Sequence, residues 1–299
     1  MREIPDSIAI AFGGNALKEK DDITVEAQER AMRKAAVIIA SIRKVVKHVL
    51  VTHGNGPQVG WMANRVDIAA KQGMHRVPLA NLVANTQGSV GASMSRQIVN
   101  VNPTKPIGEF MDKETAGRMV AEHEWTVKEL TGGQEGKPFR RVVPSPEPIG
   151  IEEIQTIRIL LDNEMVTIGV GGGGIPFILK ANGEIVWVDA VIDKDAATAL
   201  AAIILEIKFL AIFTAEEGLY TPEDFARKGR KDNSVRPIEV VTVAEARQML
   251  SEMEAGSMGP KLKALADYTE KTQNESWVGP LDDGFNALKG EKGTFVVPD

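Results

Sequence analysis

The sequence predicts an α/β protein in which a largely parallel sheet is covered by helices on both faces. Short apolar runs alternate along the chain with longer segments of helical periodicity, which is the order of elements that builds such a sheet. The runs are almost wholly apolar, as strands buried between two layers of helices are. In addition, 43% of the 299 residues are hydrophobic, so the chain can bury a large core.

In the first half of the chain, each element follows from the local pattern of side chains. The expected strands are short runs of Ile, Leu, Val, Ala and Phe, and the expected helices place their apolar residues on one face. Two prolines exclude a helix at 102–106 and predict an extended or turning segment. The glycines and charges of 130–138 predict a surface excursion that does not pack. The other expected elements are strands at 8–12 and 48–52 and helices at 25–46, 56–72, 82–97 and 112–123.

The second half continues the alternation. An apolar stripe predicts a helix at 151–161, and a buried strand is expected at 165–170. The turn pair Asn182-Gly183 predicts a hairpin of strands at 177–180 and 185–188. The remaining expected elements are strands at 209–214 and 293–298 and helices at 194–206, 243–254 and 260–269.

Composition excludes several classes of protein. The net charge of −6 lacks the basic footprint of a nucleic-acid-binding domain, and no apolar stretch approaches the ~20 residues that span a bilayer. The chain has no Cys, and its four His residues lack the spacing of a metal site. The apolar run at 8–12 is too short for a signal peptide. We therefore expect a cytoplasmic protein with no resident metal and no nucleic-acid or membrane partner.

Three glycine-rich turns each come directly after an expected strand. Bare backbone at the carboxyl ends of parallel strands lets N–H groups approach a ligand closely, and a following helix N-terminus favours negative charge. Each turn alone could be an ordinary tight turn, but three turns after three strands favour a phosphate site at one edge of the sheet. The turns are Gly13-Gly14-Asn15, Gly54-Asn55-Gly56 and Gly171-Gly172-Gly173-Gly174.

The familiar phosphate-binding motifs are absent. The sequence contains no P-loop of the form GxxxxGK[ST], and the second glycine turn continues as PQVG, which does not make GxGxxG. The HRD and DFG motifs of protein kinases and the GxSxG nucleophile elbow are also missing. A different class of phosphate-binding protein is therefore needed.

Seven stretches of the sequence resemble the carbamate kinase family, a branch of the amino acid kinase superfamily. They occur in the order found in that family and cover nearly the whole chain. GGNA alone would be a weak signal, but HGNGPQVG, NPTKPIG and VVPSPEP together are highly specific. The stretches are AFGGNAL (11–17), VTHGNGPQVG (51–60), NPTKPIG (102–108), RVVPSPEPI (141–149), IGVGGGGIP (168–176), AVIDKD (190–195) and GSMGPKLKA (256–264).

The resemblance implies a fold and a reaction. The fold is an amino acid kinase-like three-layer αβα sandwich with a small protruding subdomain. Residues 1–150 would form an N-terminal lobe on the carbamate side, with the protruding excursion at about 102–143, and residues 151–299 a C-terminal, nucleotide-binding lobe. The reaction would be reversible phosphoryl transfer between ATP and carbamate, giving ADP and carbamoyl phosphate, with Mg²⁺ carried by the nucleotide. The family also implies a homodimer and a role in arginine metabolism.

The same resemblance implies roles for individual residues. Phosphoryl transfer asks for positioning and positive charge more than for covalent chemistry, so lysines are suitable catalytic groups and an aspartate is suited to orient them. The residues implied are Lys105, Lys194, Asp195 and Lys261 for catalysis, His53 with the glycine turns for substrate and phosphate, and Asp193, Glu217, Tyr220 and Met258 for the nucleotide.

Explanations without a ligand stay open for some of these residues. Residues 193–195 could also be an exposed helix start, where the two aspartates interact favourably with the helix dipole. His53 could be a histidine at a strand end whose hydrogen bonds are all made within the protein. Met258 could simply pack in the hydrophobic core. Lys261 differs, because a positive charge at a helix start is unfavourable and therefore favours a ligand role.

The chain departs from the family pattern in three places. The segment before NPTKPIG is markedly shorter, which leaves 96–101 to bridge it. Residues 214–220 lack the Asp-rich pattern of relatives, so Glu217 would replace an aspartate, and Val278-Gly279-Pro280 replaces a more regular junction. Two other functions therefore stay open: a degenerate, non-catalytic nucleotide-binding protein of the same fold, and a kinase for another small anion such as acetylglutamate or UMP.

Overall fold

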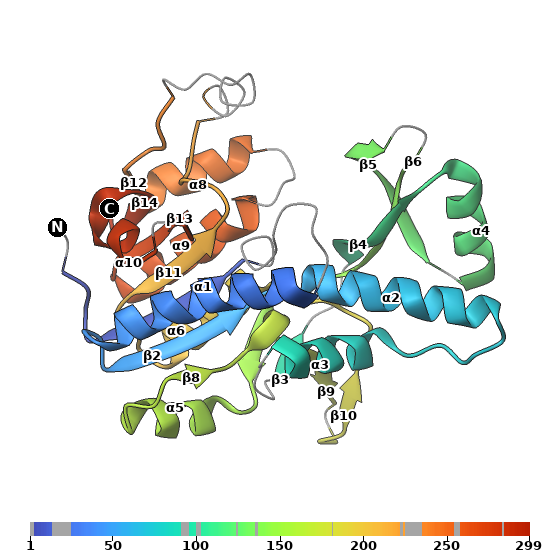
Figure 1. Ribbon diagram of the computed structural model, residues 1–299, viewed down its shortest axis with the longest axis horizontal. Helices are drawn as coiled ribbons and strands as arrows, with labels where there is room; N and C mark the ends of the chain where they lie inside the picture. Colours follow the sequence, from blue (N-terminus) through green and yellow to red (C-terminus); the bar gives the residue numbers. More distant parts are fainter. Residues whose placement is uncertain are drawn as a thin grey trace.

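A computed structural model shows a central sheet between two layers of helices, with a smaller group of elements standing beside it (Figure 1). The residues that the structure describes are 3–13, 25–90, 96–99, 103–123, 125–134, 137–180, 182–221, 224, 235–253, 258–282 and 284–299. Within these ranges, no helix is both long enough and apolar enough to cross a membrane.

Seven described strands form the central sheet. Neighbouring strands run parallel except for β13 and β14, which pair in the antiparallel direction. The expected α/β class with a largely parallel sheet is therefore confirmed. In sheet order the strands are β12 (Val240–Thr242), β14 (Thr294–Val297), β13 (Ser276–Pro280), β11 (Leu210–Thr214), β1 (Ser7–Phe12), β2 (His48–His53) and β8 (Thr167–Ile168).

Side chains on the strands alternate between the two helical layers. On β1, Ala9 and Ala11 face one layer, whereas Ile8, Ile10 and Phe12 face the other. The alanines are small and the helix over them is itself rich in alanine, so helix and sheet approach closely. The first layer contains α5 (Ile154–Asp162), α6 (Lys194–Ile204), α8 (Val243–Glu252) and α9 (Met258–Thr272), and the second contains α1 (Val25–Arg43) and α10 (Gly284–Asn286).

A second sheet contains the expected hairpin and two strands that were not expected. The hairpin forms around Asn182-Gly183, as the turn pair predicts. The prediction of a helix at 82–97 is wrong at its end, because α3 (Leu79–Val90) is followed by the strand β3 (Arg96–Val99). β3 pairs with strands that lie far along the chain, which local periodicity cannot reveal. In sheet order the strands are β10 (Ile185–Trp187), β9 (Ile175–Leu179), β3 and β7 (Pro148–Ile151).

A small three-stranded sheet with one helix stands beside the central sheet, at the right of Figure 1. An extended segment was expected at 102–106, and the first strand of this sheet confirms it from Pro103 onward. The prediction that 130–138 would not pack is wrong, because two strands pair there, with Gln134 opposite Lys137 and a register irregularity before Gln134, where two glycines fall. The elements are β4 (Pro103–Met111), α4 (Lys113–His123), β5 (Thr126–Gln134) and β6 (Lys137–Pro144), in the sheet order β4-β6-β5, and α2 (Gly56–Lys71) contacts β4.

The strands β8 and β13 of the central sheet differ from expectation, and β12 was not expected either. The prediction of a buried strand at 165–170 is wrong, since only β8 pairs there and Met165 is 54% exposed. β8 is the last strand of the sheet, so no described strand pairs with its outer edge. β13 was not expected because a glycine and a proline end it, yet all five of its residues are buried between β11 and β14.

The division of the chain into two lobes at residue 150 stays a prediction. β8, which follows residue 150, lies beside β2 in the central sheet. β9, also from the second half, lies beside β3 in the second sheet. Both sheets therefore contain strands from each side of the expected boundary.

Candidate active site

The first two glycine turns lie together at one edge of the central sheet. β1 and β2 are parallel neighbours, so their carboxyl ends meet. The Gly54 N–H donates to the carbonyl oxygen of Phe12 at 2.9 Å, and the Gly13 N–H donates to a carbonyl oxygen of β11 at the same distance. The sheet therefore brings together two of the turns that the sequence places at one edge. Gly14 and Asn15 lie outside the described residues.

The third glycine run forms a short 3-10 turn, η1 (Gly171–Gly173), against the start of α6. Gly173 has a φ of +92°, and a Cβ at this position would overlap the backbone carbonyl group of Ile192, whose carbon would lie 2.9 Å away. Only glycine therefore fits here. Ile192 lies two residues before α6, so the close contact fixes η1 beside the first turn of that helix.

Helix α3 ties the second and third glycine turns together. The Gln87 side-chain amide donates to the carbonyl oxygen of Gly171, and the Asn55 side-chain amide donates to the Thr86 hydroxyl at 2.8 Å. All three side chains are buried. Sequence reasoning missed Thr86 and Gln87. The available signal was that both continue the buried stripe of α3 at helical spacing, where the preceding turns carry leucine and valine.

Two lysines from different helices meet on one carboxylate. Asp195, in the first turn of α6, is only 2% exposed. Lys194 Nζ donates to Asp195 Oδ1, and Lys261 Nζ lies 3.3 Å from Asp195 Oδ2. Lys261 comes from the first turn of α9, which packs against α6. The two ammonium groups thus place positive charge around one buried carboxylate, while the charge of Asp193, at the start of α6, also acts on Lys194. Ammonium groups held in this way suit an anionic ligand.

Asp193 holds the turn that presents Lys194. Its carboxylate caps α6 by accepting hydrogen bonds from the backbone N–H groups of Asp195, at 2.8 Å, and of the next residue, at 3.4 Å. One turn later, Thr198 Oγ1 donates to the Lys194 carbonyl oxygen at 2.6 Å and lies 2.7 Å from Thr52 Oγ1 on β2. An exposed helix start is excluded, because Lys194 and Asp195 are both buried.

Burial controls protonation at this site. It lowers the pKa of the Lys194 ammonium; the neighbouring Asp195 opposes this effect, and Lys261 adds to it. Burial also lowers the pKa of His53. A hydrogen bond with the Gly54 carbonyl oxygen opposes this effect, and the charge of Lys194 adds to it. His53 is therefore neutral at pH 7. Its Nε2 atom is buried and has no hydrogen-bond partner among the described residues, so the alternative of a fully satisfied histidine does not hold there.

We expect His53 to make the protein less stable as the pH falls. Its ordinary pKa is 6.5 and its folded-state pKa is lower, so below pH 6.5 the unfolded chain binds a proton that the folded chain does not. The melting temperature should therefore drop less between pH 7.5 and pH 5.5 in His53→Asn than in the wild type. His75→Asn, which changes an exposed histidine, should keep the wild-type drop. Equal drops in the wild type and His53→Asn would contradict a buried neutral imidazole.

The residues expected on the nucleotide side fall in two places. Met258 is the first residue of α9 and packs against the core, three positions before Lys261. Beyond β11, the Tyr220 hydroxyl donates to Glu217 Oε2 at 2.8 Å. Glu217 also lines a hollow of about 710 Å³ near β12 and β14. Neither Lys194 nor Lys261 lines this hollow. The structure thus places Met258 near the lysine pair and joins the other two residues to each other.

Lys105 lies on β4 of the small sheet, with its backbone opposite Val143 of β6. Its side chain is not among those described, so its approach to the lysine pair stays a prediction. Within the described ranges, no three acidic or histidine side chains gather in the manner of a metal site. The cationic character of the site therefore rests on Lys194 and Lys261.

The fold and the pair of lysines on a buried carboxylate define the class of protein, and comparison with known proteins agrees. The chain belongs to the amino acid kinase family, whose profile matches residues 6–278. Its full-length relatives place it with the carbamate kinases of that family. It is 34% identical to the carbamate kinase of Pyrococcus horikoshii, over 99% of this chain and 100% of the relative, and 35% identical to that of Pyrococcus furiosus, over 97% and 99%. The structure of the carbamate kinase from Giardia lamblia bound to AMP-PNP aligns with a TM-score of 0.84 at 31% identity, covering 98% of this chain and 99% of that one.

Proposed function

We propose that this protein is a carbamate kinase, which transfers a phosphoryl group reversibly between ATP and carbamate and gives ADP and carbamoyl phosphate. One observation carries the proposal: Lys194 and Lys261 converge on Asp195 beside the glycine turn η1. The names of the Pyrococcus relatives support carbamate as the acceptor, and the AMP-PNP complex of the Giardia relative supports an adenine nucleotide as the donor.

The lysines supply the charge that the reaction needs. In phosphoryl transfer, negative charge is spread over the oxygens of the migrating group, and catalysis consists mainly of positioning and electrostatic stabilisation. In this proposal Lys194 and Lys261 face those oxygens, Asp195 positions both ammonium groups, and Lys105 adds a third charge from the small sheet. Burial strengthens the attraction because little water screens it. Carbamate is already an anionic nucleophile, so no general base is required.

The substrates occupy two sides of the lysine pair. The N–H groups of Gly13, Gly54, Gly173 and Gly174 donate to carbonyl oxygens within the fold. The other backbone N–H groups of the glycine turns, with His53, hold carbamate and the transferred phosphoryl group, and the nucleotide lies toward Met258, Glu217 and Tyr220. The carboxylates at the centre are engaged, Asp195 by two lysines and Asp193 by the N-terminus of α6, so the site suits a Mg²⁺ ion held by the nucleotide phosphates. The ion supplies charge neutralisation when bound. A cytoplasmic location and a role in arginine metabolism stay predictions.

The two alternative functions have less support. A degenerate nucleotide-binding protein would not need two lysines assembled on a buried carboxylate, as they are here. A kinase for acetylglutamate or UMP would not be expected to have full-length relatives above 30% identity that are named carbamate kinases. Both observations favour carbamate as the acceptor.

Formation of ATP tests the proposal directly. Purified protein with ADP, Mg²⁺ and carbamoyl phosphate should form ATP, measured by luciferase luminescence, whereas ATP consumption with acetylglutamate or UMP should stay at background. If no ATP forms while calorimetry shows that ATP binds, the enzyme proposal is wrong and the non-catalytic alternative replaces it.

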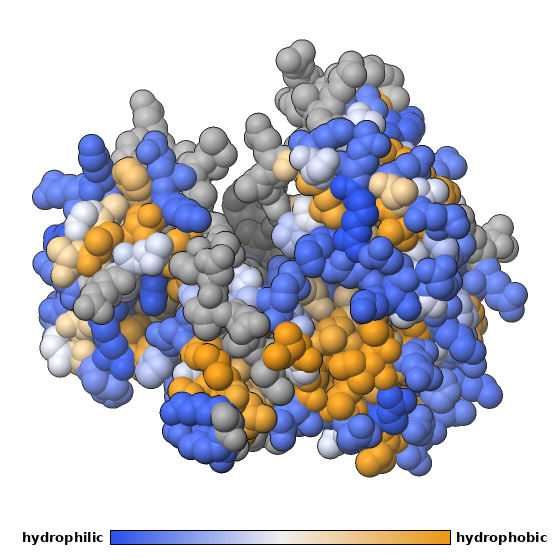
Figure 2. Space-filling view, turned by 180° about the vertical axis from the view of Figure 1, so that it is seen from behind, coloured by the Kyte–Doolittle hydropathy of each residue, from blue (hydrophilic) through white to orange (hydrophobic). Residues whose placement is uncertain are grey.

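The proposal includes a homodimer that forms through an apolar face. We define this face as Ile159, Met165, Val166 and Ile168 of the α5–β8 region together with Leu179, Ile185 and Trp187 of the β9–β10 hairpin, all exposed large apolar side chains. Figure 2 shows apolar side chains gathered along the lower part of the molecule, where these elements lie. An exposed apolar area of this kind is typical of an interface, and the open edge of β8 lies within it.

Substitutions in the apolar face should separate the dimer. Light scattering after gel filtration should give twice the chain mass for the wild type and a single chain mass for the double variant Ile168→Asp/Trp187→Asp, because two buried carboxylates oppose association. Val37→Asp, an exposed apolar position on α1 of the opposite helical layer, should remain dimeric. A dimer that survives the double variant would place the interface elsewhere.

A further inference from the structure

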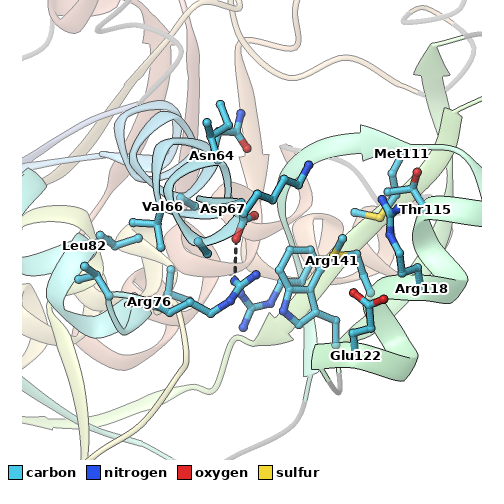
Figure 3. Close-up of a pocket in the computed structure, with 18 of the residues that line it drawn as sticks. Asn64, Val66, Asp67, Arg76, Leu82, Met111, Thr115, Arg118, Glu122 and Arg141 are labelled. Atoms are coloured by element: carbon cyan, nitrogen blue, oxygen red, sulfur yellow. Dashed lines mark hydrogen bonds and ion pairs between the residues drawn. The ribbon is translucent and has the colours of Figure 1, made fainter. Parts of the chain in front are cut away.

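A hollow of about 910 Å³ lies between the second half of α2 and the small sheet (Figure 3). Its volume falls in the range of small-molecule sites. Asp67 lines it from α2, eleven residues beyond Gly56, so it lies about 16 Å along the helix from the glycine turn that begins α2. The lining includes neither Lys194 nor Lys261. This hollow is therefore separate from the site proposed for phosphoryl transfer.

The lining combines apolar and cationic side chains. Met111, Met119 and Trp125 supply apolar surface from the small sheet and α4. Four cationic side chains outnumber two acidic ones, which gives the hollow a net charge of +2 in a protein whose net charge is −6. The charged residues are Lys71, Arg76, Arg118 and Arg141 against Asp67 and Glu122.

Arg141 is a partly buried cation of this lining, whereas Lys71 and Arg118 are exposed. Its guanidinium lies 4.7 Å from the centroid of the Trp125 ring. Asp67, an acidic lining residue whose charge acts on Arg141, forms an ion pair of 2.7 Å with Arg76 instead, as the dashed line in Figure 3 marks. Burial lowers the pKa of Arg141, Asp189 and Asp67 oppose this effect from a distance, and Arg76 adds to it. Among the described residues Arg141 forms no direct ion pair, so an anion in the hollow would add a carboxylate or phosphate group in contact with its guanidinium.

We propose that this hollow binds a small organic anion, with its carboxylate or phosphate group on Arg141 and its apolar body against Trp125 and the two methionines. An arginine fork matches the oxygens of a carboxylate or phosphate group, and methionine adapts to ligands of different shape. The ligand would touch α2 and the small sheet together. Lys105 lies near the start of β4 and Met111 is its last residue. A ligand that touches Met111 would therefore contact the opposite end of the strand that carries Lys105.

Phenyl phosphate is a suitable probe, because it combines an aromatic body with a phosphate group. Isothermal titration calorimetry should show binding to the wild type and to Lys194→Ala with equal affinity. Inorganic phosphate and benzyl alcohol, which each lack one half of the probe, should bind at least about tenfold more weakly. The measurement does not depend on catalysis, so it remains valid if the proposed kinase activity is not found.

Three variants locate the probe. Arg141→Gln should weaken binding at least about tenfold. Arg118→Gln removes an exposed charge from the lining and cannot disturb the core, so it should weaken binding severalfold in a folded protein. Arg65→Gln, an exposed arginine on α2 outside the lining, makes the same change in net charge and should leave the affinity unchanged. Wild-type affinity in both Arg141→Gln and Arg118→Gln, or loss of binding in Lys194→Ala, would overturn the proposal.

Discussion

Lys194→Ala should lower kcat for ATP formation by about 10³-fold, with a smaller change in the KM for ADP. The ammonium group is buried beside Asp195, where its charge is little screened by water and faces the proposed position of the migrating phosphoryl group. Its removal leaves Asp195 with Lys261 and takes one positive charge out of the cluster. Steady-state rates with ADP, Mg²⁺ and carbamoyl phosphate measure the effect.

Two controls separate a loss of catalysis from a loss of folding. Lys208→Ala removes an exposed lysine whose only described ion pair is with the exposed Asp6, at 3.5 Å, so kcat should stay within twofold of the wild type. Circular dichroism of Lys194→Ala should show native secondary structure at the assay temperature. A kcat within tenfold of the wild type in folded Lys194→Ala would remove this lysine from the proposed mechanism.

Gly173→Ala should destabilise the protein by about 3 kcal/mol and abolish ATP formation. The residue has a φ of +92°, which costs a side chain backbone strain, and the new methyl group would overlap the Ile192 carbonyl. Relief of that overlap requires η1 to move away from α6 and therefore away from Lys194. Denaturant unfolding measures the loss of stability, and the ATP assay measures the loss of turnover.

Gly183→Ala is the matched control for this substitution. Gly183 has a similar φ, +82°, but nothing lies within 4 Å of the position of its Cβ. It should therefore show only the backbone cost, about 1 kcal/mol, with normal kcat. Equal losses of stability in the two variants would mean that the contact with Ile192 does not restrict position 173.

Elements that depend on nearby residues were predictable. Apolar runs marked β1, β2 and β11, and the turn pair Asn182-Gly183 marked the β9–β10 hairpin. The gathering of glycine turns was also predictable, because parallel strands end at a common edge. Lys261 was different. Its charge at a helix start indicated a ligand role, but only the resemblance to a family placed it with Lys194, since the two are 67 positions apart.

Elements that depend on distant partners escaped prediction. β3 is a strand because β7 and β9 flank it, and β13 is a strand because β11 and β14 enclose it despite the glycine and proline at its end. The packing of 130–138 likewise depends on the pairing of β5 with β6. Thr86 and Gln87 looked like ordinary helix positions until the fold placed the glycine turns against them.

The α/β class, the order of most elements and the three glycine turns could be predicted without a structure, because periodicity and turn chemistry are properties of neighbouring residues. The family resemblance supplied the lysines to consider. Packing of the folded chain was needed to place Lys194 and Lys261 on a shared Asp195, to tie two glycine turns together through α3, and to set Arg141 beside Trp125. These contacts join residues from separate elements, and their existence depends on how helices and sheets pack around a common core.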